Sequence, residues 1–289
     1  MQTTTERVAA ETAPRAATYA TILVHAEPGT AGSSRVEAAA RLARDLDATL
    51  LGVGAETFDA TLTPDPFIGY ASGEWIGLVQ DQIGKDLIAA EAAFRRDAAG
   101  ARIEWRTVQD YPAEAIARAA HAVDLIVVSP RGSAGVTRSA DPADVVMSAG
   151  RPVLMVPPNR LALRGQSVVV AWKDSRECRR ALSDAMPFLA KAHDVIVLAV
   201  TKPNDIPAAE LETSEVVTHL KRHGIAARAV ASSPSTGTYV EEIARVAEAN
   251  NADLIVCGAY GHSRLREWAF GGVTTALIHR PPCFVLMTH

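Results

Sequence analysis

Apolar residues in this chain fall into short unbroken runs that alternate with longer stretches of helical periodicity. The runs Leu254–Cys257 and Leu125–Val128 contain no polar residue, which is typical of strands buried on both faces of a parallel sheet. Between such runs, residues 237–249 carry apolar side chains at positions i, i+3, i+4 and i+7, which form one stripe along a helix. This alternation predicts an α/β fold with a parallel sheet and helices on both faces.

In the C-terminal half of the chain, the pattern predicts five strands and four helices. The strands are expected near residues 167–172, 194–200, 226–231, 253–257 and 283–287. The helices are expected near residues 175–191, 208–223, 237–249 and 272–280. Because short links join strands and helices in strict alternation, this half should form a doubly wound five-stranded sheet.

The same pattern occurs twice. The run that starts at Asp124 matches the run at Asp253 at an offset of 129 residues, and the run at Thr21 matches the run at Ser167 at an offset of 146. Similar segments at two offsets indicate a duplication in which the first copy is longer. The difference between the offsets is 17 residues, and we expect this insertion within residues 56–84.

We therefore predict two tandem doubly wound five-stranded parallel-sheet domains of the Rossmann-like type. The first spans residues 17–158 and the second residues 164–289, whereas residues 1–16 are expected to form a disordered lead-in. Both copies end in an apolar strand, and an exposed apolar edge strand favours pairing. The strand Pro152–Val156 is therefore expected beside Cys283–Met287, as in an internal pseudo-dimer. A further homodimer is left open.

Composition and charge narrow the class of protein. The formal net charge is −4, and no basic stripe is present that could neutralise nucleic-acid phosphates. No apolar run approaches the roughly 20 residues of a membrane helix, and the first residues lack the apolar core of a secretory signal. The three cysteines form no CxxC pair. We expect a cytoplasmic protein without a nucleic-acid or membrane partner.

Four glycines follow the buried run Leu254–Cys257. Gly258 and Gly261 come directly after this strand, and Gly271 and Gly272 stand where the next helix begins. A strand, a glycine loop and a helix N-terminus together present free backbone N–H groups to an anion, and a side chain would keep phosphate oxygens away from them. The alternative is a strand exit and a glycine-opened helix that hold no ligand.

The glycine spacing, with the segment Val170–Glu177 after the first strand of the C-terminal copy, resembles the universal stress protein family. The duplication is similar to its tandem members. The resemblance implies that ATP or another adenine nucleotide binds outside the carboxyl ends of the strands. The residues it implies in this site are Ala171, Trp172, Lys173, Asp174, Val200, Gly258, Gly261, His262, Ser263, Arg264, Gly271, Gly272, Val273 and Thr274.

The C-terminal copy departs from the family pattern at two positions. Lys173, followed by Asp174, stands where an acidic residue usually ends the first strand. The third glycine of the family pattern is usually followed directly by a hydroxyl residue, but here Thr274 lies two positions after Gly272. Each departure removes one expected bond to the nucleotide.

The first copy departs further. The offset of 129 residues places Ser129, Gly132, Pro142 and Ala143 at the four glycine positions. Proline lacks the backbone donor that an anion needs. We therefore expect that only the C-terminal copy binds a nucleotide.

No catalytic constellation and no metal site is recognised in the sequence. The chain has no G-x-S-x-G elbow and no G-x-x-x-x-G-K-[ST] loop. The leading hypothesis is a non-enzymatic stress-response protein that senses or carries a small ligand. A nucleotide-hydrolysing or nucleotide-transferring enzyme and a ligand-free interaction module are the alternatives. In the predicted insertion, Trp75 lies among apolar residues that either cover the first copy's strand ends or pack on a partner.

Overall fold

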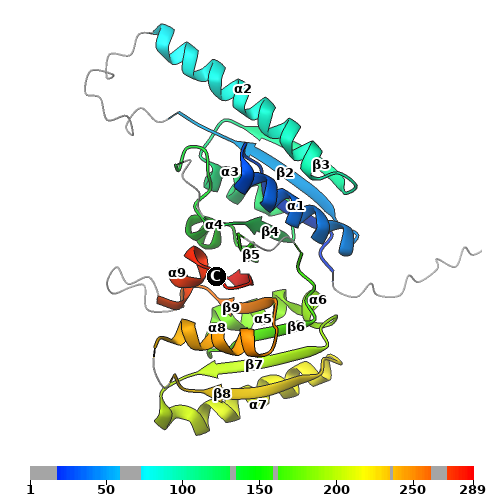
Figure 1. Cartoon of the computed structure of the whole chain (residues 1–289), viewed down its shortest axis with the longest axis vertical. Coiled ribbons are helices and arrows are strands. Elements are labelled where there is room, and N and C mark those ends of the chain that lie inside the picture. The colour runs from blue at the N-terminus through cyan, green and yellow to red at the C-terminus, as the bar shows by residue number, and fades with distance from the viewer. Residues whose placement is uncertain (1–17, 59–72, 131–134, 159–161, 235–236, 262–271) are drawn as a thin grey trace, which may run out of the picture.

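The computed structural model describes residues 18–58, 73–130, 135–158, 162–234, 237–261 and 272–289. These residues form one ten-stranded sheet with helices on both faces (Figure 1). The strands are β1 Thr21–His25, β2 Thr49–Ala55, β3 Arg102–Val108, β4 Leu125–Val128, β5 Val153–Met155, β6 Ser167–Ala171, β7 Asp194–Val200, β8 Ala227–Ser232, β9 Leu254–Gly258 and β10 Phe284–Thr288.

Helices connect these strands. The α-helices are α1 Thr30–Asp45, α2 Gly73–Asp97, α3 Pro112–Ala119, α4 Pro142–Ser148, α5 Arg176–Asp184, α6 Met186–Leu189, α7 Ile206–Arg222, α8 Tyr239–Ala249 and α9 Gly272–His279. Two short 3-10 turns, η3 Ala120–Ala122 and η4 Pro203–Asp205, complete the described elements. The sequence therefore predicted the α/β class and the strand–helix alternation correctly.

The order of strands in the sheet is β3-β2-β1-β4-β5-β10-β9-β6-β7-β8. Strands β1–β5 of the N-terminal half and strands β6–β10 of the C-terminal half thus follow the same order, 3-2-1-4-5. Pairing within each half is parallel. The halves join where β5 runs antiparallel to β10, with Leu154 opposite Leu286. The predicted pairing of Pro152–Val156 with Cys283–Met287 is confirmed.

Two apolar layers cover the sheet. One layer lies under α1, α2, α5, α6 and α7, and it includes Phe94 of the first half and Leu220 of the second. The other layer lies under α3, α4, α8 and α9, and it includes Ile116 and Ile243. Each layer continues across the β5–β10 pair, since both contain buried residues of both halves. Successive residues of a strand point to opposite layers. Because both layers are apolar, the buried strands are apolar at every position.

One predicted helix of the C-terminal half is divided in two. The helix expected over residues 175–191 is divided into α5 and α6, with Ala185 between them. Pro187 stands in the first turn of α6. Proline has no N–H for a helical hydrogen bond and its ring clashes with the preceding turn, so the chain starts a new helix there.

The N-terminal half is longer around α2. This helix has 25 residues, whereas α7 at the corresponding place has 17. Residues 59–72 of the predicted insertion, and the predicted lead-in of residues 1–16, lie outside the described residues. Trp75, which the sequence placed in the insertion, packs edge to face on Phe58 with ring centroids 5.2 Å apart.

Candidate functional site

Several of the predicted nucleotide residues that the structure describes lie near the carboxyl ends of three adjacent strands in the C-terminal half. The strands lie in the order β9-β6-β7, and Ala171 at the end of β6 is level with Cys257 on β9 and Leu198 on β7. Val200 ends β7. In Figure 1, β7 points to the left of the view, so this edge of the sheet faces left. Carboxyl ends of parallel strands are where open α/β sheets bind ligands.

The chain that leaves β6 is partly exposed. The backbone N–H of Trp172 donates to the Leu198 carbonyl at 2.7 Å, and its half-buried indole packs on the α5 side of the sheet. Lys173 and Asp174 are exposed. Asp174 forms an ion pair with Arg179 at 3.4 Å, with both side chains more than half exposed. Lys173 is thus an exposed cation two residues after the end of β6.

Helix α5 begins directly beside this strand end. The Ser175 hydroxyl caps the helix by accepting a hydrogen bond from the Cys178 N–H at 3.2 Å. Glu177, in the same first turn, is buried, and its carboxylate pairs with Arg176 at 3.2 Å. A carboxylate near a helix N-terminus is stabilised by the helix dipole. The first turn of α5 therefore places a buried carboxyl group beside Gly261, in the loop that follows β9.

Gly258 has a packing role. A Cβ atom at this position would lie 2.6 Å from the Cys178 nitrogen and 2.9 Å from the Glu177 Cβ. Its backbone N–H donates to the Cys178 sulfur at 3.4 Å. The glycine therefore allows α5 to approach β9 closely. The Gly258 N–H already has an acceptor. The close packing of α5 on β9 therefore explains why glycine stands at this position without an anion.

The loop after Gly258 is tied to the sheet and to α9. The Ala259 N–H donates to the Thr288 carbonyl at 2.9 Å, and the Tyr260 N–H makes a long contact of 3.5 Å with the Thr274 hydroxyl. Thr274 is buried. Its hydroxyl thus contacts the loop backbone, whereas the sequence placed it in the nucleotide site. Tyr260 is buried and has a φ of 56°, in the left-handed region.

Gly261 and Gly272 differ from Gly258. A Cβ on Gly261 would lie 3.4 Å from Glu177 Oε2, which is ordinary contact distance. Gly272 is exposed at the first position of α9, and apart from its own helix no described residue has an atom within 4 Å of where its Cβ would be. Val273 beside it is half-buried against the α8–α9 layer. The predicted residues His262, Ser263, Arg264 and Gly271 lie outside the described residues.

The matching strand ends of the N-terminal half are filled by a buried arginine. Arg35 on α1 is 4% exposed, and its Nε donates to the His25 carbonyl at 2.9 Å. Its guanidinium also donates to Ser129 Oγ at 2.7 Å and pairs with Glu27 at 3.1 Å. Ser129 is the residue that the sequence aligned with Gly258. The arginine therefore connects the ends of β1 and β4 with α1.

This cluster keeps His25 neutral. The ring is 1% exposed, and burial together with the nearby Arg35 charge lowers its pKa to about 3, although a hydrogen bond to the Ala55 carbonyl acts in the opposite direction. Burial disfavours the charged form of an imidazole. The positive charge at these strand ends is therefore the Arg35 guanidinium, which Glu27 balances.

The N-terminal half also ties down the chain that follows β4. The Thr57 N–H donates to the Thr137 carbonyl at 3.1 Å. Arg138 forms ion pairs with Glu56 at 2.9 Å and with Asp86 on α2. At the start of α4, Asp141 accepts from the Ala143 N–H at 2.9 Å. Pro142 has no N–H, so two of the first backbone donors of α4 are unavailable to an anion.

Sequence reasoning missed the side chains that organise both sets of strand ends. In the C-terminal half these are Glu177 and Cys178, and in the N-terminal half Glu27 and Arg35. One signal was available: Arg35 has the helical spacing of the buried residues Ala39 and Leu42. A charged residue in the buried phase of a helix needs a partner inside the protein. For Glu177, the hydroxyl of Ser175 two residues earlier indicates a helix start, but not the burial of the carboxylate.

Two cavities lie away from the predicted site. The first, of about 620 Å³, is lined by residues of α3 and α4 such as Ala117 and Met147. The second, of about 370 Å³, lies between α8 and α9 and is lined by Ala244 and Ala276. They occupy corresponding places in the two halves. Within the described parts of the chain, no group of three or more metal-ligating side chains is present, and no helix is long and apolar enough to cross a membrane.

Comparison with protein families identifies the class of the C-terminal half. Residues 165–289 match the family model of the Universal stress protein family. A universal stress protein domain is thus found in the half that carries the glycine loop. The comparison with curated protein sequences gave no match.

Solved structures share the fold over both halves. A universal stress protein from Archaeoglobus fulgidus DSM 4304 has a TM-score of 0.65 at 18% identity, over 93% of this chain and 95% of that chain. A functionally unknown protein from Pseudomonas aeruginosa PAO1 has a TM-score of 0.56 at 15% identity, over 93% of this chain and 92% of that one. At these identities the likeness concerns the fold. The α/β architecture predicted from the sequence is confirmed.

Proposed function

We propose that this protein is a non-enzymatic, cytoplasmic stress-response protein that senses or carries a small ligand. The ligand is an adenine nucleotide, and it binds at the carboxyl ends of β6, β7 and β9. In this proposal the chain consists of two tandem domains, residues 17–158 and 164–289, of which only the second binds the nucleotide. The matched family model, over residues 165–289, covers the whole proposed site.

The open start of α9 is the observation that carries the proposal. Gly272 is exposed, and apart from its own helix no described residue has an atom within 4 Å of the place where its Cβ would be. The N-terminus of a helix offers backbone N–H groups and the positive end of the helix dipole to an anion. A phosphate can therefore approach the backbone at this place without displacing a side chain of the described residues. The exposed Lys173 at the end of β6 adds a positive charge at the same edge of the sheet.

The N-terminal half supports the asymmetry of the proposal. Arg35 and Ser129 occupy the space between the ends of β1 and β4, and Arg138 fixes the following loop to Glu56. A nucleotide bound in the family manner would have to displace the buried Arg35 from its partners. Breaking a buried ion pair costs about 3–5 kcal/mol, which is a large part of the free energy of a micromolar ligand.

Titration calorimetry on the full chain tests the proposal. ATP and AMP are the ligands, and a flavin is the control ligand. Replacing Lys173 by Glu should weaken ATP binding about tenfold or more, because one contact to a charged group is lost and a repulsion is added. Lys221→Glu is the matched control, since Lys221 is equally exposed but lies in the last turn of α7.

The outcomes separate the candidate functions. Binding of ATP that Lys173→Glu weakens and Lys221→Glu leaves unchanged supports the proposed site. Equal affinities for all three proteins would place the ligand elsewhere. No heat of binding with any nucleotide would favour the ligand-free interaction module.

A further inference from the structure

Helix α2 presents a second stripe of side chains that is exposed among the residues that the structure describes. Its inner face packs on α1, β2 and β3 and is formed by the buried residues Ile83, Leu87, Ala90 and Phe94. On the opposite face, successive exposed residues are spaced by three and four positions. This outer stripe consists of Leu78, Asp81, Lys85, Ile88 and Ala92. The spacing is that of one continuous seam along a helix.

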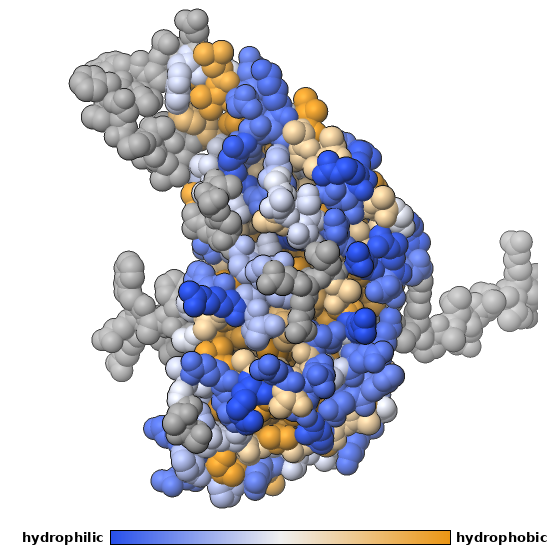
Figure 2. Space-filling view, in the orientation of Figure 1, coloured by the Kyte–Doolittle hydropathy of each residue, from blue (hydrophilic) through white to orange (hydrophobic). Residues whose placement is uncertain are grey.

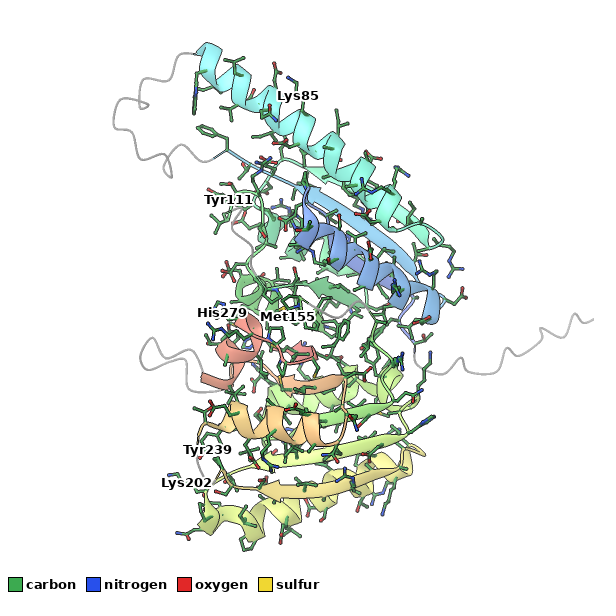
Figure 3. All side chains as sticks on the ribbon, viewed as in Figure 1. Lys85, Tyr111, Met155, Lys202, Tyr239 and His279 are labelled. Carbon is green, nitrogen blue, oxygen red and sulfur yellow. The ribbon has the colours of Figure 1, made fainter. Side chains whose placement is uncertain are left out.

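The outer stripe combines exposed apolar residues with charges of both signs. Leu78 is 64% exposed and Ile88 is 71% exposed, which makes them two of the most exposed large apolar side chains of the described chain. Asp81 and Lys85 lie between them on the same face. Figure 2 shows apolar and hydrophilic residues side by side along the upper end of the molecule, where Figure 1 places α2. Lys85 is labelled on this helix in Figure 3.

This stripe is complementary to itself in one orientation. If two α2 helices pack antiparallel and cross level with Ile83, Leu78 meets the partner's Ile88, and Asp81 meets the partner's Lys85. The two-fold symmetry repeats both contacts, so the seam has two apolar pairs flanking two ion pairs. Such an interface is closed by its own symmetry and produces a dimer.

The alternative arrangements lack this complementarity. In a parallel pair, each residue meets its own copy, so that Asp81 faces the partner's Asp81 and Lys85 faces the partner's Lys85. Like charges in direct opposition are destabilising. Shifting the antiparallel pair by one heptad would place an apolar residue against a charge. The sequence of the stripe therefore selects both the orientation and the register.

We infer that two copies of this chain associate through the outer stripe of α2, as an antiparallel helix pair. In Figure 1, α2 is the outermost element of the N-terminal half and lies at the end of the molecule opposite α7, so the C-terminal half does not obstruct the partner. One helix pair is a small interface, at the lower end of the range for specific complexes. The dimer therefore forms reversibly, at micromolar or higher concentrations of protein. The inference does not depend on the proposed nucleotide site.

The corresponding helix of the C-terminal half provides the control. Leu211 on α7 is 65% exposed, as much as Leu78. The positions that match the spacing of the outer stripe are Ser214, Thr218 and Lys221, which are exposed and include no acidic residue. Helix α7 therefore has a similar exposed leucine without a self-complementary stripe.

Sedimentation velocity over a concentration series of the full chain tests the inference by a charge swap. Wild type should show a monomer–dimer equilibrium. Asp81→Lys should weaken the dimer about tenfold or more, because each lysine then faces another lysine. The double variant Asp81→Lys with Lys85→Asp restores opposite charges and should return the dissociation constant close to wild type. Ile88→Glu should abolish the dimer, and Leu211→Glu should leave it unchanged.

Two results would overturn the inference. One is a wild-type chain that stays monomeric up to the highest concentration measured. The other is a dimer whose dissociation constant is the same in the single and the double charge variants. All substituted side chains are exposed, so thermal unfolding of each variant should match wild type and show that the fold is intact.

Discussion

In both halves a glycine allows a helix to pack closely on the strand ends, but the glycine lies on the helix in one half and on the strand in the other. In both halves the first turns of a helix approach the carboxyl end of the sheet very closely. In the N-terminal half the glycine is on the helix: a Cβ on Gly32 of α1 would lie 2.2 Å from the Glu27 carbonyl oxygen. In the C-terminal half the glycine is on the strand, since a Cβ on Gly258 would lie 2.6 Å from the Cys178 nitrogen. Glycine is used where a backbone approaches another backbone.

The choice of glycine position goes together with a difference in charge. At the offset of 146 residues, the buried Arg35 of α1 corresponds to Ala181 of α5, and Glu27 corresponds to Lys173. The N-terminal half thus places an ion pair inside its strand ends, and the C-terminal half leaves its lysine at the surface. The strand ends of the N-terminal half are therefore occupied by internal contacts of Arg35, whereas Lys173 at the C-terminal strand ends is exposed.

The largest expected effect follows from removing the buried arginine. Arg35→Met leaves the carboxylate of Glu27 buried without its cation, so we expect the free energy of unfolding to fall by about 3–5 kcal/mol. Urea denaturation followed by circular dichroism measures this loss. Arg180→Met on the exposed face of α5 is the control, with an expected change within about 0.5 kcal/mol. Equal losses in the two variants would mean that the buried contacts of Arg35 do not stabilise the fold more than those of an exposed arginine.

The two close approaches predict a second, smaller effect. Gly32→Ala and Gly258→Ala each force a methyl group against backbone atoms at less than 3 Å, and overpacking of this kind costs about 1–3 kcal/mol. Gly77→Ala on α2 is the matched control, because no atom lies within 4 Å of its Cβ position. This control should stabilise the protein by about 0.5–1 kcal/mol. If all three variants unfold at the same urea concentration as wild type, the backbone at Gly32 and Gly258 has room for a methyl group, which would contradict the close packing at these positions.

Acid should destabilise the fold through the buried His25. The pKa of His25 is lowered from 6.5 to about 3 in the fold, so below pH 6.5 the unfolded chain takes up a proton that the folded chain does not. Stability therefore decreases as the pH falls from about 6.5 towards 3, by at most about 1.4 kcal/mol per pH unit for one group. His25→Gln should flatten the pH profile of the unfolding free energy in this range. An unchanged slope would show that His25 is protonated in the folded protein.

Much of the fold was predictable because it depends on the pattern of apolar residues. In the C-terminal half, each of the five predicted strands lies within one residue of its observed position at both ends, and the pairing of β5 with β10 follows from two exposed apolar edges. The division of the predicted helix over residues 175–191 was missed because apolar periodicity continues through Ala185, although Pro187 changes the hydrogen bonding.

The candidate site was predictable only in outline. The positions of the strand ends follow from the strands, so Lys173, Val200 and Gly258 are correctly placed on one edge of the sheet. The partner of each side chain does not follow from the pattern. The contacts of Thr274 with the Tyr260 N–H and of the Gly258 N–H with the Cys178 sulfur could not be read from the pattern. Such contacts depend on distances between elements that are far apart in the sequence.

Hydrogen exchange of the full chain with and without saturating ATP tests the contrast between the two halves most directly. We expect ATP to slow hydrogen exchange in peptides covering residues 171–176 and 258–275, which contain the C-terminal strand ends and the glycine loop. Peptides covering residues 25–32 and 129–143, where Arg35 and Arg138 hold the chain, should exchange at the same rate with and without the nucleotide. Protection of the N-terminal peptides, with none in the C-terminal half, would contradict the account.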